Sequence, residues 1–358
     1  MAESILNNSI FEENSLTQNV SEYIPQKVSG FWWKFNEIWR AYVHPFFLII
    51  AFVSNILNIF ILPRTSIQKH LKLYYWTMAV ADSSIVILTY LWLFTGPGLY
   101  FATNGAIAFY PMTFNTYLCK FITIFANITK NYSDYTYVLL ALDRLYAIFF
   151  PLKSFASLKK SIAGCIIILL ISSSYHFTLT YYIVIIIPNS TVNYDNKDCL
   201  PDNTFKTIGV QFYLSYVISS FFLQNILHLV IVIIFNFLLI QKLATESARR
   251  KSLTAQSQLN LENKRKSSKA EINATVTLLT VSIVHVMANI PNATFWIWLA
   301  AMNSLNPAQK ANRTPIWQIV ANTARTAQLF SILDYFSNFL VYYFRIPSFR
   351  KQLHICLS

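Results

Sequence analysis

Long apolar runs alternate with short polar connections along this chain. About 20 apolar residues in a helix cross the roughly 30 Å of hydrocarbon in a bilayer, with every backbone hydrogen bond made inside the segment. Seven runs approach or exceed that length: residues 44–62, 73–94, 116–150, 162–187, 207–240, 272–302 and 316–344. The third, fifth and sixth runs exceed what a bilayer needs, so we expect tilt or protrusion into water. The pattern predicts an all-α membrane protein with seven spans.

Composition agrees with a membrane protein and argues against a soluble one. Hydrophobic residues make up 55% of the 358 residues, and Asp, Glu, Lys and Arg make up only 12%, half of the roughly 25% that soluble domains carry. Glycine occurs 6 times, and the sequence holds no glycine-rich phosphate-binding motif. The formal net charge of +13 could indicate nucleic-acid binding, so the position of the charges has to decide.

Lysine and arginine gather on one side of the predicted membrane. The connections after spans one, three and five, the inner end of span three and the tail hold 18 of the 28. Cytoplasmic loops carry this excess, so the amino terminus is predicted to lie outside. Membrane topology thereby explains the basic charge, and we expect no nucleic-acid partner.

The predicted outer segments carry candidate modification sites. Asn7, Asn19 and Asn189 each begin an Asn-x-Ser/Thr sequon outside the membrane, where glycosylation occurs. The same pattern also occurs within spans, so the sequons alone are weak support. Cys119 at the outer start of span three and Cys199 in the outer loop after span four lie where oxidising conditions permit a disulfide.

Several motifs resemble one family of receptors. Leu142–Ile148 reads Leu-Asp-Arg-Leu-Tyr-Ala-Ile and is followed by Pro151. This resembles the Asp-Arg-Tyr region of rhodopsin-family (class A) G-protein-coupled receptors. Cys119 lies 25 residues before Arg144, which is the family's spacing for its outer disulfide, and the resemblance therefore implies a bridge to Cys199. Further matches are Ser54-Asn55 in span one, Ala79–Asp82 in span two, Pro291 in span six with Glu271 twenty residues earlier, and Asn338–Tyr342 followed by Phe349-Arg350 in span seven.

The resemblance covers about residues 40–357 and implies a fold and a location. The implied fold is a seven-transmembrane helix bundle with a short amphipathic C-terminal helix. Residues 1–43 would be an extracellular N-terminal segment, 44–344 the receptor domain, and 345–358 a cytoplasmic amphipathic helix and tail. The implied protein is a multi-pass receptor of the plasma membrane that senses an extracellular ligand. Its partners would be a heterotrimeric G protein and membrane lipid.

The resemblance also implies an inner switch. Asp143 would neutralise Arg144, Glu271 would clamp it from span six, and Asn338 and Tyr342 would complete the set from span seven. A charged pair that neighbouring charges hold in one state and release in another is a bistable element. In the simpler interpretation, Asp143 and Arg144 only extend their charges to the membrane surface.

A second implied site is a buried polar pocket in mid-membrane. An intramembrane carboxylate such as Asp82 is costly unless it is paired or hydrated. The resemblance places Ser133, Asp334 and Asn338 around it, with Asn55 from span one, in a site similar to the family's sodium pocket. Asp334 replaces the family's usual asparagine, so the two carboxylates either hold a cation such as Na⁺ more strongly or share a proton. The alternative is an inert polar core satisfied by water.

Departures from the family pattern narrow the ligand class. Phe339 replaces the span-seven proline, Leu145 the third motif residue, and Asn289 the tryptophan two residues before the span-six proline. These losses resemble divergent invertebrate neuropeptide (FMRFamide-like) or orphan receptors. Ala126 stands where amine receptors have an aspartate, and Ile332 where opsins have a lysine. Amines and retinal are therefore not expected as ligands.

A short basic, aromatic peptide is the ligand class that remains. The second outer loop holds Asp195, Asp198 and Asp202, and an aromatic stretch covers residues 31–35. Acidic loops suit a basic partner, although the aromatic stretch equally fits an interfacial belt.

Three polar residues of the spans are candidates for the ligand pocket. Lys130 and Arg325 are intramembrane cations that could receive a carboxylate or a peptide carbonyl, and Asn289 in span six is the third candidate. Lys130 and Asp134 are also four residues apart on one helix, where opposite charges pair. Internal pairing and ligand contact therefore remain open for Lys130.

Three ionisable residues occupy the family's apolar connector. Where the family packs a branched apolar residue, a proline and a phenylalanine, this chain has Asp134, His228 and His285. A buried polar group costs about 1–3 kcal/mol unless it is paired, and one carboxylate with two imidazoles is a plausible transition-metal set. We hypothesise a switch that responds to protonation or zinc. A static hydrogen-bonded network, with Lys130 competing for Asp134, is the alternative.

Two other function classes are weighed against a receptor. Buried Asp82, Lys130, Asp134, Arg325 and Asp334 could mark the path of an ion, as in a channel or transporter. Such a protein would pass current or substrate without a G protein. The sequence has no His-Glu-x-x-His or Gly-x-Ser-x-Gly motif, so enzymatic activity and a catalytic cofactor are not expected.

Overall fold

A computed structural model describes residues 38–89, 99–103, 106, 116–150, 157–180, 183–185, 199–201, 219, 222–254, 262–303 and 331–358. The bundle helices are α3 (His44–Ile61), α4 (Lys69–Thr89), α6 (Thr116–Phe149), α7 (Leu158–Thr180), α10 (His228–Thr254), α11 (Glu262–Asn303) and the helical segment 331–345. Shorter elements are the π-turns η1 (Trp39–Val43) and η6 (Phe222–Leu227), the 3-10 turn η2 (Leu62–Arg64), α5 (Leu99–Ala102), α14 (Pro347–Leu357) and the strands β1 (Ile183–Ile185) and β2 (Cys199–Pro201).

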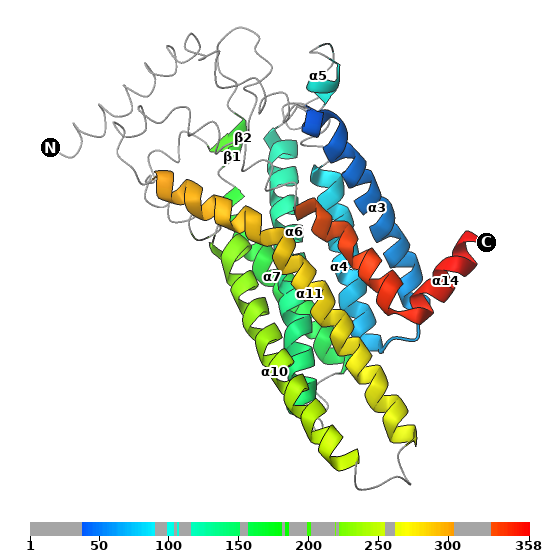
Figure 1. The fold of residues 1–358 in the computed structure, drawn as a ribbon. Coiled ribbons are helices and arrows are strands. Elements are labelled where there is room, and N and C mark those ends of the chain that lie inside the picture. Colours follow the sequence, from blue (N-terminus) through cyan, green and yellow to red (C-terminus); the bar gives the residue numbers. More distant parts are fainter. Residues whose placement is uncertain are drawn as a thin grey trace, which may run out of the picture.

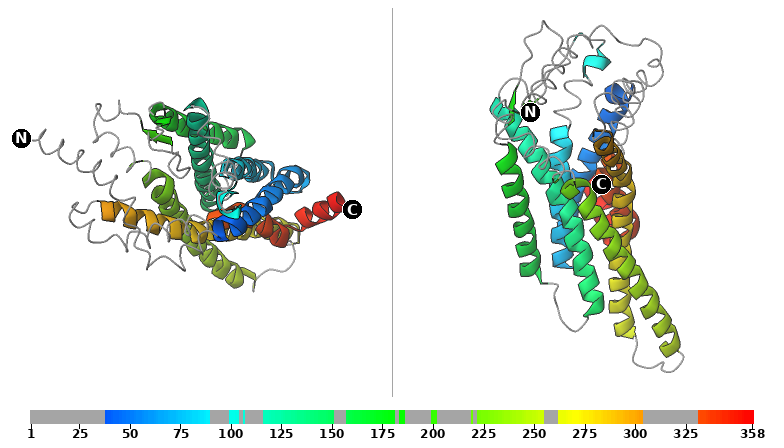
Figure 2. Two further views of the ribbon diagram at one scale, coloured as in Figure 1. Left: turned by 90° about the horizontal axis from the view of Figure 1, so that it is seen from above. Right: turned by 90° about the vertical axis from the view of Figure 1, so that its left-hand side faces the viewer.

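The long helices pack side by side in one bundle (Figures 1 and 2). Helices α4 and α6 lie at its centre, since α4 contacts α3, α6 and α7, and α6 also contacts α10 and α11. At one end α10 and α11 extend beyond the other helices, and at the opposite end β1 and β2 lie beside the start of α6 (Figure 1). The predicted all-α, seven-helix membrane fold is confirmed.

The apolar runs predicted most helix positions, and α6 matches its run at both ends to within one residue. The helix of the fifth span continues past the predicted end at residue 240, because α10 runs to Thr254. The helix of the sixth span begins before the predicted start at residue 272, because α11 starts at Glu262. The parts of α10 and α11 that project beyond the other helices therefore include polar residues outside the predicted apolar runs. Helix α4 begins at Lys69, four residues before its predicted start at residue 73.

The predicted end of span four was wrong. The apolar run continues to residue 187, but α7 ends at Thr180 and Ile183–Ile185 form β1. This strand pairs antiparallel with β2, with Ile183 opposite Pro201 and Ile185 opposite Cys199. The run ends in isoleucine and valine, whose branched side chains favour strands over helices. The outer loop thus carries a short hairpin-like sheet against α6.

The first span ends where proline requires it. Pro63 cannot donate the backbone hydrogen bond that a continued helix needs, and α3 passes into the 3-10 turn Leu62–Arg64. Thr65 Oγ1 donates to the Leu62 carbonyl at 2.7 Å and closes that turn. At the other end, the π-turn Trp39–Val43 runs directly into α3, so helical structure begins before the predicted boundary at residue 44.

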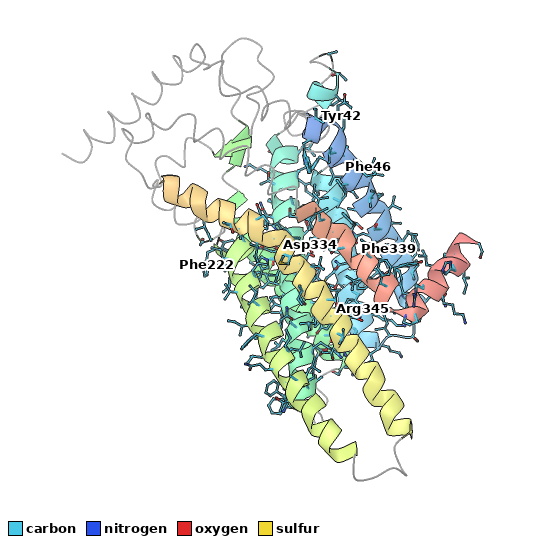
Figure 3. All side chains as sticks on the ribbon, in the orientation of Figure 1. Tyr42, Phe46, Phe222, Asp334, Phe339 and Arg345 are labelled. Atoms are coloured by element: carbon cyan, nitrogen blue, oxygen red, sulfur yellow. The ribbon has the colours of Figure 1, made fainter. Side chains whose placement is uncertain are left out.

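The bundle is apolar outside, and its interior combines an apolar core with many buried polar side chains. Four helical segments of the described residues have the length and apolarity to cross a membrane: Ala41–Arg64, Leu158–Phe177, Asn225–Thr245 and Thr275–Thr294. Large apolar side chains such as Tyr42, Phe46 and Phe222 point away from the helices (Figure 3). Asp334, by contrast, is buried between helices (Figure 3). Exposed apolar surface around buried polar side chains is typical of a bundle that faces lipid.

The short helix after the last span is amphipathic, as predicted. Ile346, Phe349 and Leu353 recur at helical spacing and are buried, whereas Arg350 and Lys351 on the other side are exposed. Phe349 packs against the ring of Phe339 with 5.7 Å between centroids and against that of Tyr342 with 5.9 Å. These contacts fix α14 to the end of the last span.

Candidate functional site

The inner end of α6 holds a buried ionic cluster. The Arg144 Nη2 donates to Asp143 Oδ2 at 2.8 Å, and the same nitrogen lies 2.7 Å from Nε2 of His70. His70 Nε2 is 3.5 Å from Asp143 Oδ2. All three residues are buried. The predicted switch pair is therefore held by a third residue, from the first turn of α4.

His70 was not predicted as a site residue. In the sequence it stands beside Lys69 and close to Lys72 at the inner membrane face, where a basic residue is explained by topology alone. An arginine guanidinium donates and never accepts, so His70 Nε2 is the acceptor in its hydrogen bond with Arg144. We call His70, Asp143 and Arg144 the inner clamp.

The remaining switch residues lie in two different situations. Tyr342 is fully buried, with its ring 4.8 Å from that of Tyr75, and its hydroxyl has no hydrogen-bond partner among the described residues. The backbone of Glu271 belongs to α11, but its side chain lies outside the part of the structure that is described. The predicted clamp from span six is thus left as a prediction.

Two of the predicted pocket residues donate hydrogen bonds to the carboxylate of a third, Asp82. Ser133 Oγ donates to Asp82 Oδ1 at 2.6 Å, and Asn338 Nδ2 donates to Asp82 Oδ2 at 3.3 Å. Asn338 and Tyr137 are also joined by hydrogen bonds, at 2.7 Å from Asn338 Nδ2 and 3.1 Å to Asn338 Oδ1. Asn55 donates to the backbone carbonyl of Tyr335 at 2.8 Å. This set links α4, α6 and the last span.

Asp334 has different partners from those predicted. Its Oδ2 accepts hydrogen bonds from His285 Nδ1 at 2.7 Å and from Asn289 Nδ2 at 3.1 Å, both on α11. Its Oδ1 has no hydrogen-bond partner among the described residues. Asn289, predicted to contact ligand, is buried and also donates to the His285 carbonyl at 2.9 Å. The structure therefore places Asp334 and Asn289 with the predicted connector.

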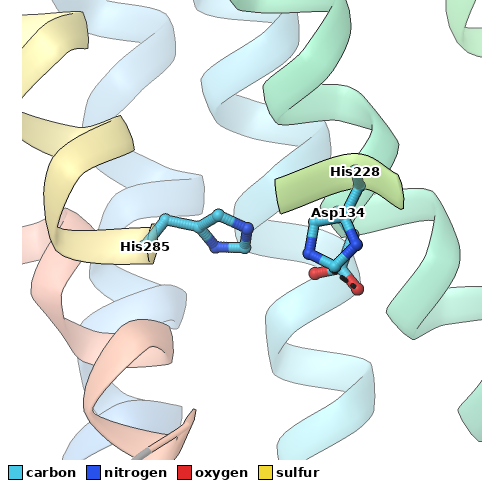
Figure 4. A group of neighbouring side chains, drawn as sticks. All are labelled: Asp134, His228 and His285. Atoms are coloured by element: carbon cyan, nitrogen blue, oxygen red, sulfur yellow. Dashed lines mark ion pairs between the residues drawn. The ribbon is translucent and has the colours of Figure 1, made fainter. Parts of the chain in front are cut away.

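The predicted connector residues do converge (Figure 4). Asp134 comes from α6, His228 from the start of α10 and His285 from α11, and all three are buried. The His228 and His285 ring centroids are 5.5 Å apart, and His228 Nε2 is 4.0 Å from Asp134 Oδ2. Lys130 Nζ donates to Asp134 Oδ2 at 3.2 Å. The name connector cluster is used below for Asp134, His228 and His285.

A π-turn positions the α10 member of this cluster. η6 ends at Leu227, immediately before His228, and π-turns inside helices are frequent at functional sites. Asn292 Nδ2 donates to Asn225 Oδ1 at 3.1 Å, and Tyr135 OH donates to the Leu223 carbonyl at 3.1 Å. The turn is thereby tied to α11 and α6, the two helices that carry the other members.

The pocket around Asp82 and the connector cluster touch through two rings. Tyr137 and His285 stack with centroids 4.0 Å apart and an interplanar angle of 19°. Tyr137 bonds to Asn338, and His285 bonds to Asp334. One polar network therefore runs through the bundle from Lys130 to Asp82.

Some predicted residues cannot be placed. Arg325 and the sequons at Asn7, Asn19 and Asn189 lie outside the described residues. The side chains of Cys119 and Cys199 do too, so their disulfide is still a prediction. The backbone of β2, which starts at Cys199, does contact α6. Among the described cysteines, Cys165 and Cys356 are not in a disulfide.

Comparisons with known proteins point to one family. The family model described as "7 transmembrane receptor (rhodopsin family)" matches residues 43–328. A solved structure titled "Crystal structure of squid rhodopsin" superposes with a TM-score of 0.66 at 15% sequence identity, covering 90% of this chain and 85% of that one. At this identity the likeness concerns the fold alone. No curated protein matches significantly.

Proposed function

Since the chain belongs to the rhodopsin family of seven-transmembrane receptors, we propose that it senses a short extracellular peptide at the plasma membrane. In this proposal the amino terminus lies outside, and ligand binding activates a heterotrimeric G protein by releasing Arg144. Membership of this family makes the chain a membrane-spanning receptor and not an enzyme.

The inner clamp is the observation that carries the proposal. Arg144 is 4% exposed and its guanidinium contacts both Asp143 and His70. A buried guanidinium held by helices α4 and α6 has a closed arrangement and, if those contacts part, an open one with free donors. Freeing Arg144 would give a G-protein helix a cationic contact at the inner face. A pair that only reached the membrane surface would not be buried with a third partner.

The contacts of Lys130 support a basic ligand. Lys130 is paired with Asp134, and Asn289 is occupied by Asp334 and His285, so two of the three predicted pocket residues serve the polar network. The acidic residues of the second outer loop are then the groups that we propose attract a basic ligand, since opposite charges steer association. Arg325 stays a predicted contact for a carboxylate or carbonyl of that ligand.

A cation near Asp82 is the cofactor we propose. Hard cations such as Na⁺ prefer oxygen ligands. Asn55 Oδ1 and Asp334 Oδ1 are buried acceptors with no hydrogen-bond partner among the described residues, and Ser133 and Asn338 already orient the Asp82 carboxylate. These oxygens suit a cation. A proton shared by the carboxylates is the competing account, and only the cation predicts a dependence on sodium concentration.

The test is a peptide screen on cells that express the full chain. Calcium and cyclic nucleotide are read for basic aromatic peptides and for acidic peptides matched in length. We expect responses to the basic set, lost in Arg144→Ala at unchanged surface expression, and an amino-terminal epitope that antibody reaches on intact cells. Current or uptake without a G protein, combined with no peptide response, would favour an ion-conducting protein.

A further inference from the structure

The connector cluster has the composition and placement of a metal site. One carboxylate and two imidazoles from three different helices converge in the bundle, and one ligand atom of each lies within 4.8 Å of the others (Figure 4). His228 is 1% exposed, His285 is fully buried, and Asp134 is 4% exposed. Nitrogen and carboxylate donors in such a set suit zinc and similar divalent transition metals.

Three of the four histidine ring nitrogens of the cluster lack a hydrogen bond to any described residue. Both ring nitrogens of His228 and the Nε2 of His285 are buried without a hydrogen-bond partner among the described residues. Native proteins pair nearly all buried polar atoms, and each exception needs an explanation. Zinc coordination would occupy one lone pair on each ring. A static hydrogen-bonded network, the competing account, would have paired these atoms already.

The second contact of His285 is the one that metal-binding histidines usually make. A ligating histidine commonly donates its other ring N–H to a carboxylate, which fixes the tautomer and strengthens the ligand. His285 Nδ1 is 2.7 Å from Asp334 Oδ2, and an ionised carboxylate accepts this hydrogen bond. The proton is then on Nδ1, so the lone pair is on Nε2. The nitrogen left for a metal and the nitrogen that bonds to the outer carboxylate of Asp334 therefore belong to the same ring.

The formal charges around the cluster favour binding of a divalent cation. Asp82, Asp134 and Asp334 carry three formal negative charges when ionised, and all are buried. Lys130 supplies one positive charge through its ion pair with Asp134. With neutral imidazoles the formal charge of these groups is −2, which one divalent cation cancels. Lys130 competes for Asp134 Oδ2 but leaves the second carboxylate oxygen available to a metal.

We propose that Asp134, His228 and His285 bind one zinc-class divalent ion, with Asp334 as the outer partner of His285. Ligands at about 2.0–2.2 Å from a tetrahedral ion stand roughly 3.4 Å apart, so atoms now up to 4.8 Å apart must close by up to about 1.4 Å. Closing draws α6, α10 and α11 together at one level. Metal occupancy therefore selects one arrangement of these three helices, and the fourth coordination position is left for water or another donor.

The binding test uses Co²⁺ on the full chain in lipid nanodiscs, after removal of any polyhistidine tag. Tetrahedral Co²⁺ absorbs visible light and replaces zinc, so titration reports stoichiometry and geometry. We expect one Co²⁺ per chain, displaced by Zn²⁺, and loss of the band in His228→Asn and His285→Asn. Asp334→Asn should weaken the affinity about 10–100-fold. His176→Asn is the matched control, because His176 is fully buried on α7 and contacts Asn131 instead.

Each outcome decides the proposal without ligand or G protein, so its failure leaves the proposed receptor function untouched. Absence of the tetrahedral band in the wild-type chain overturns it. A band that survives both histidine variants, or that His176→Asn removes, also overturns it. If His228→Asn does not fold, the wild-type spectrum and the Asp334→Asn affinity decide instead, with an unchanged Asp334→Asn affinity contradicting the assigned outer partner.

Discussion

His70 provides the sharpest test of the inner clamp. His70→Leu puts an apolar side chain of moderate size in place of the imidazole. It removes the nitrogen that accepts a hydrogen bond from Arg144 at 2.7 Å. Hydrogen bonds to charged groups contribute about 1.5–3 kcal/mol, and solvent screens this one little because both residues are buried. In a two-state receptor whose closed clamp is silent, each 1.4 kcal/mol lost from the closed state raises the open fraction about tenfold.

We therefore expect His70→Leu to raise ligand-independent signalling at least about tenfold, while the open state is a minor population. His70→Gln is the matched control, since its carbonyl oxygen can accept from Arg144 and should keep signalling near the wild-type level. Accumulation of a second messenger is measured at matched surface expression, with Arg144→Ala as the uncoupled reference.

The result that refutes the reasoning is specific. If His70→Leu signals like the wild type while Arg144→Ala loses ligand-driven signalling, then Arg144 acts in coupling but His70 does not restrain it. Equal increases in His70→Leu and His70→Gln would mean that the ring itself matters by packing, and the accepted hydrogen bond does not.

Three further predictions test other parts of the receptor. Mass spectrometry of unreduced peptides should find Cys119 bonded to Cys199, and two free thiols would contradict the disulfide. Glu271→Ala should raise ligand-independent signalling if span six also clamps Arg144, and an unchanged basal level would leave the restraint to Asp143 and His70. Phe349→Ala should destabilise the fold by about 3–5 kcal/mol, as truncation of a buried aromatic side chain does. The control Ile355→Ala, at a side chain that is 58% exposed, should change the melting temperature little. Similar melting temperatures in both variants would contradict the docking of α14.

The sequence predicted the spans well because membrane helices need long apolar runs. It failed where a run was longer than its helix. Polar residues such as Ser172, His176 and Thr180 alternate with apolar ones in the second half of α7, so no single polar break marks its end at Thr180, and the apolar run resumes in β1. The pairing of Ile183–Ile185 with Cys199–Pro201 depends on a tertiary contact about sixteen residues away. Periodicity along one segment carries no information about that partner.

Site residues were predictable where a resemblance fixed their depth in the membrane. Asp82, Ser133 and Asn338 meet as the motif spacing implied. Motif spacing gives the depth of a residue along its helix but not which neighbouring helix its side chain faces. This is why the partners of Asp334 were predicted incorrectly. His285 offers Asp334 a close N–H donor from α11, where the family has a phenylalanine that cannot donate. His70 escaped prediction for a similar reason, since its acceptor role appears only when α4 is packed beside α6.

Asp334 belongs to both proposed ion sites. Its Oδ2 orients His285 for the connector cluster, whereas its unpaired Oδ1 is one of the oxygens proposed for the cation near Asp82. Because both ions would be stabilised by the negative charge of this one carboxylate, binding at one site should affect binding at the other. Any coupling between the two binding equilibria must be reciprocal. Sodium should therefore lower the affinity for the divalent ion by the same factor by which the divalent ion lowers the affinity for sodium. The ring of Tyr137, which bonds to Asn338, stacks on His285 of the connector cluster and so connects the two sites by packing as well.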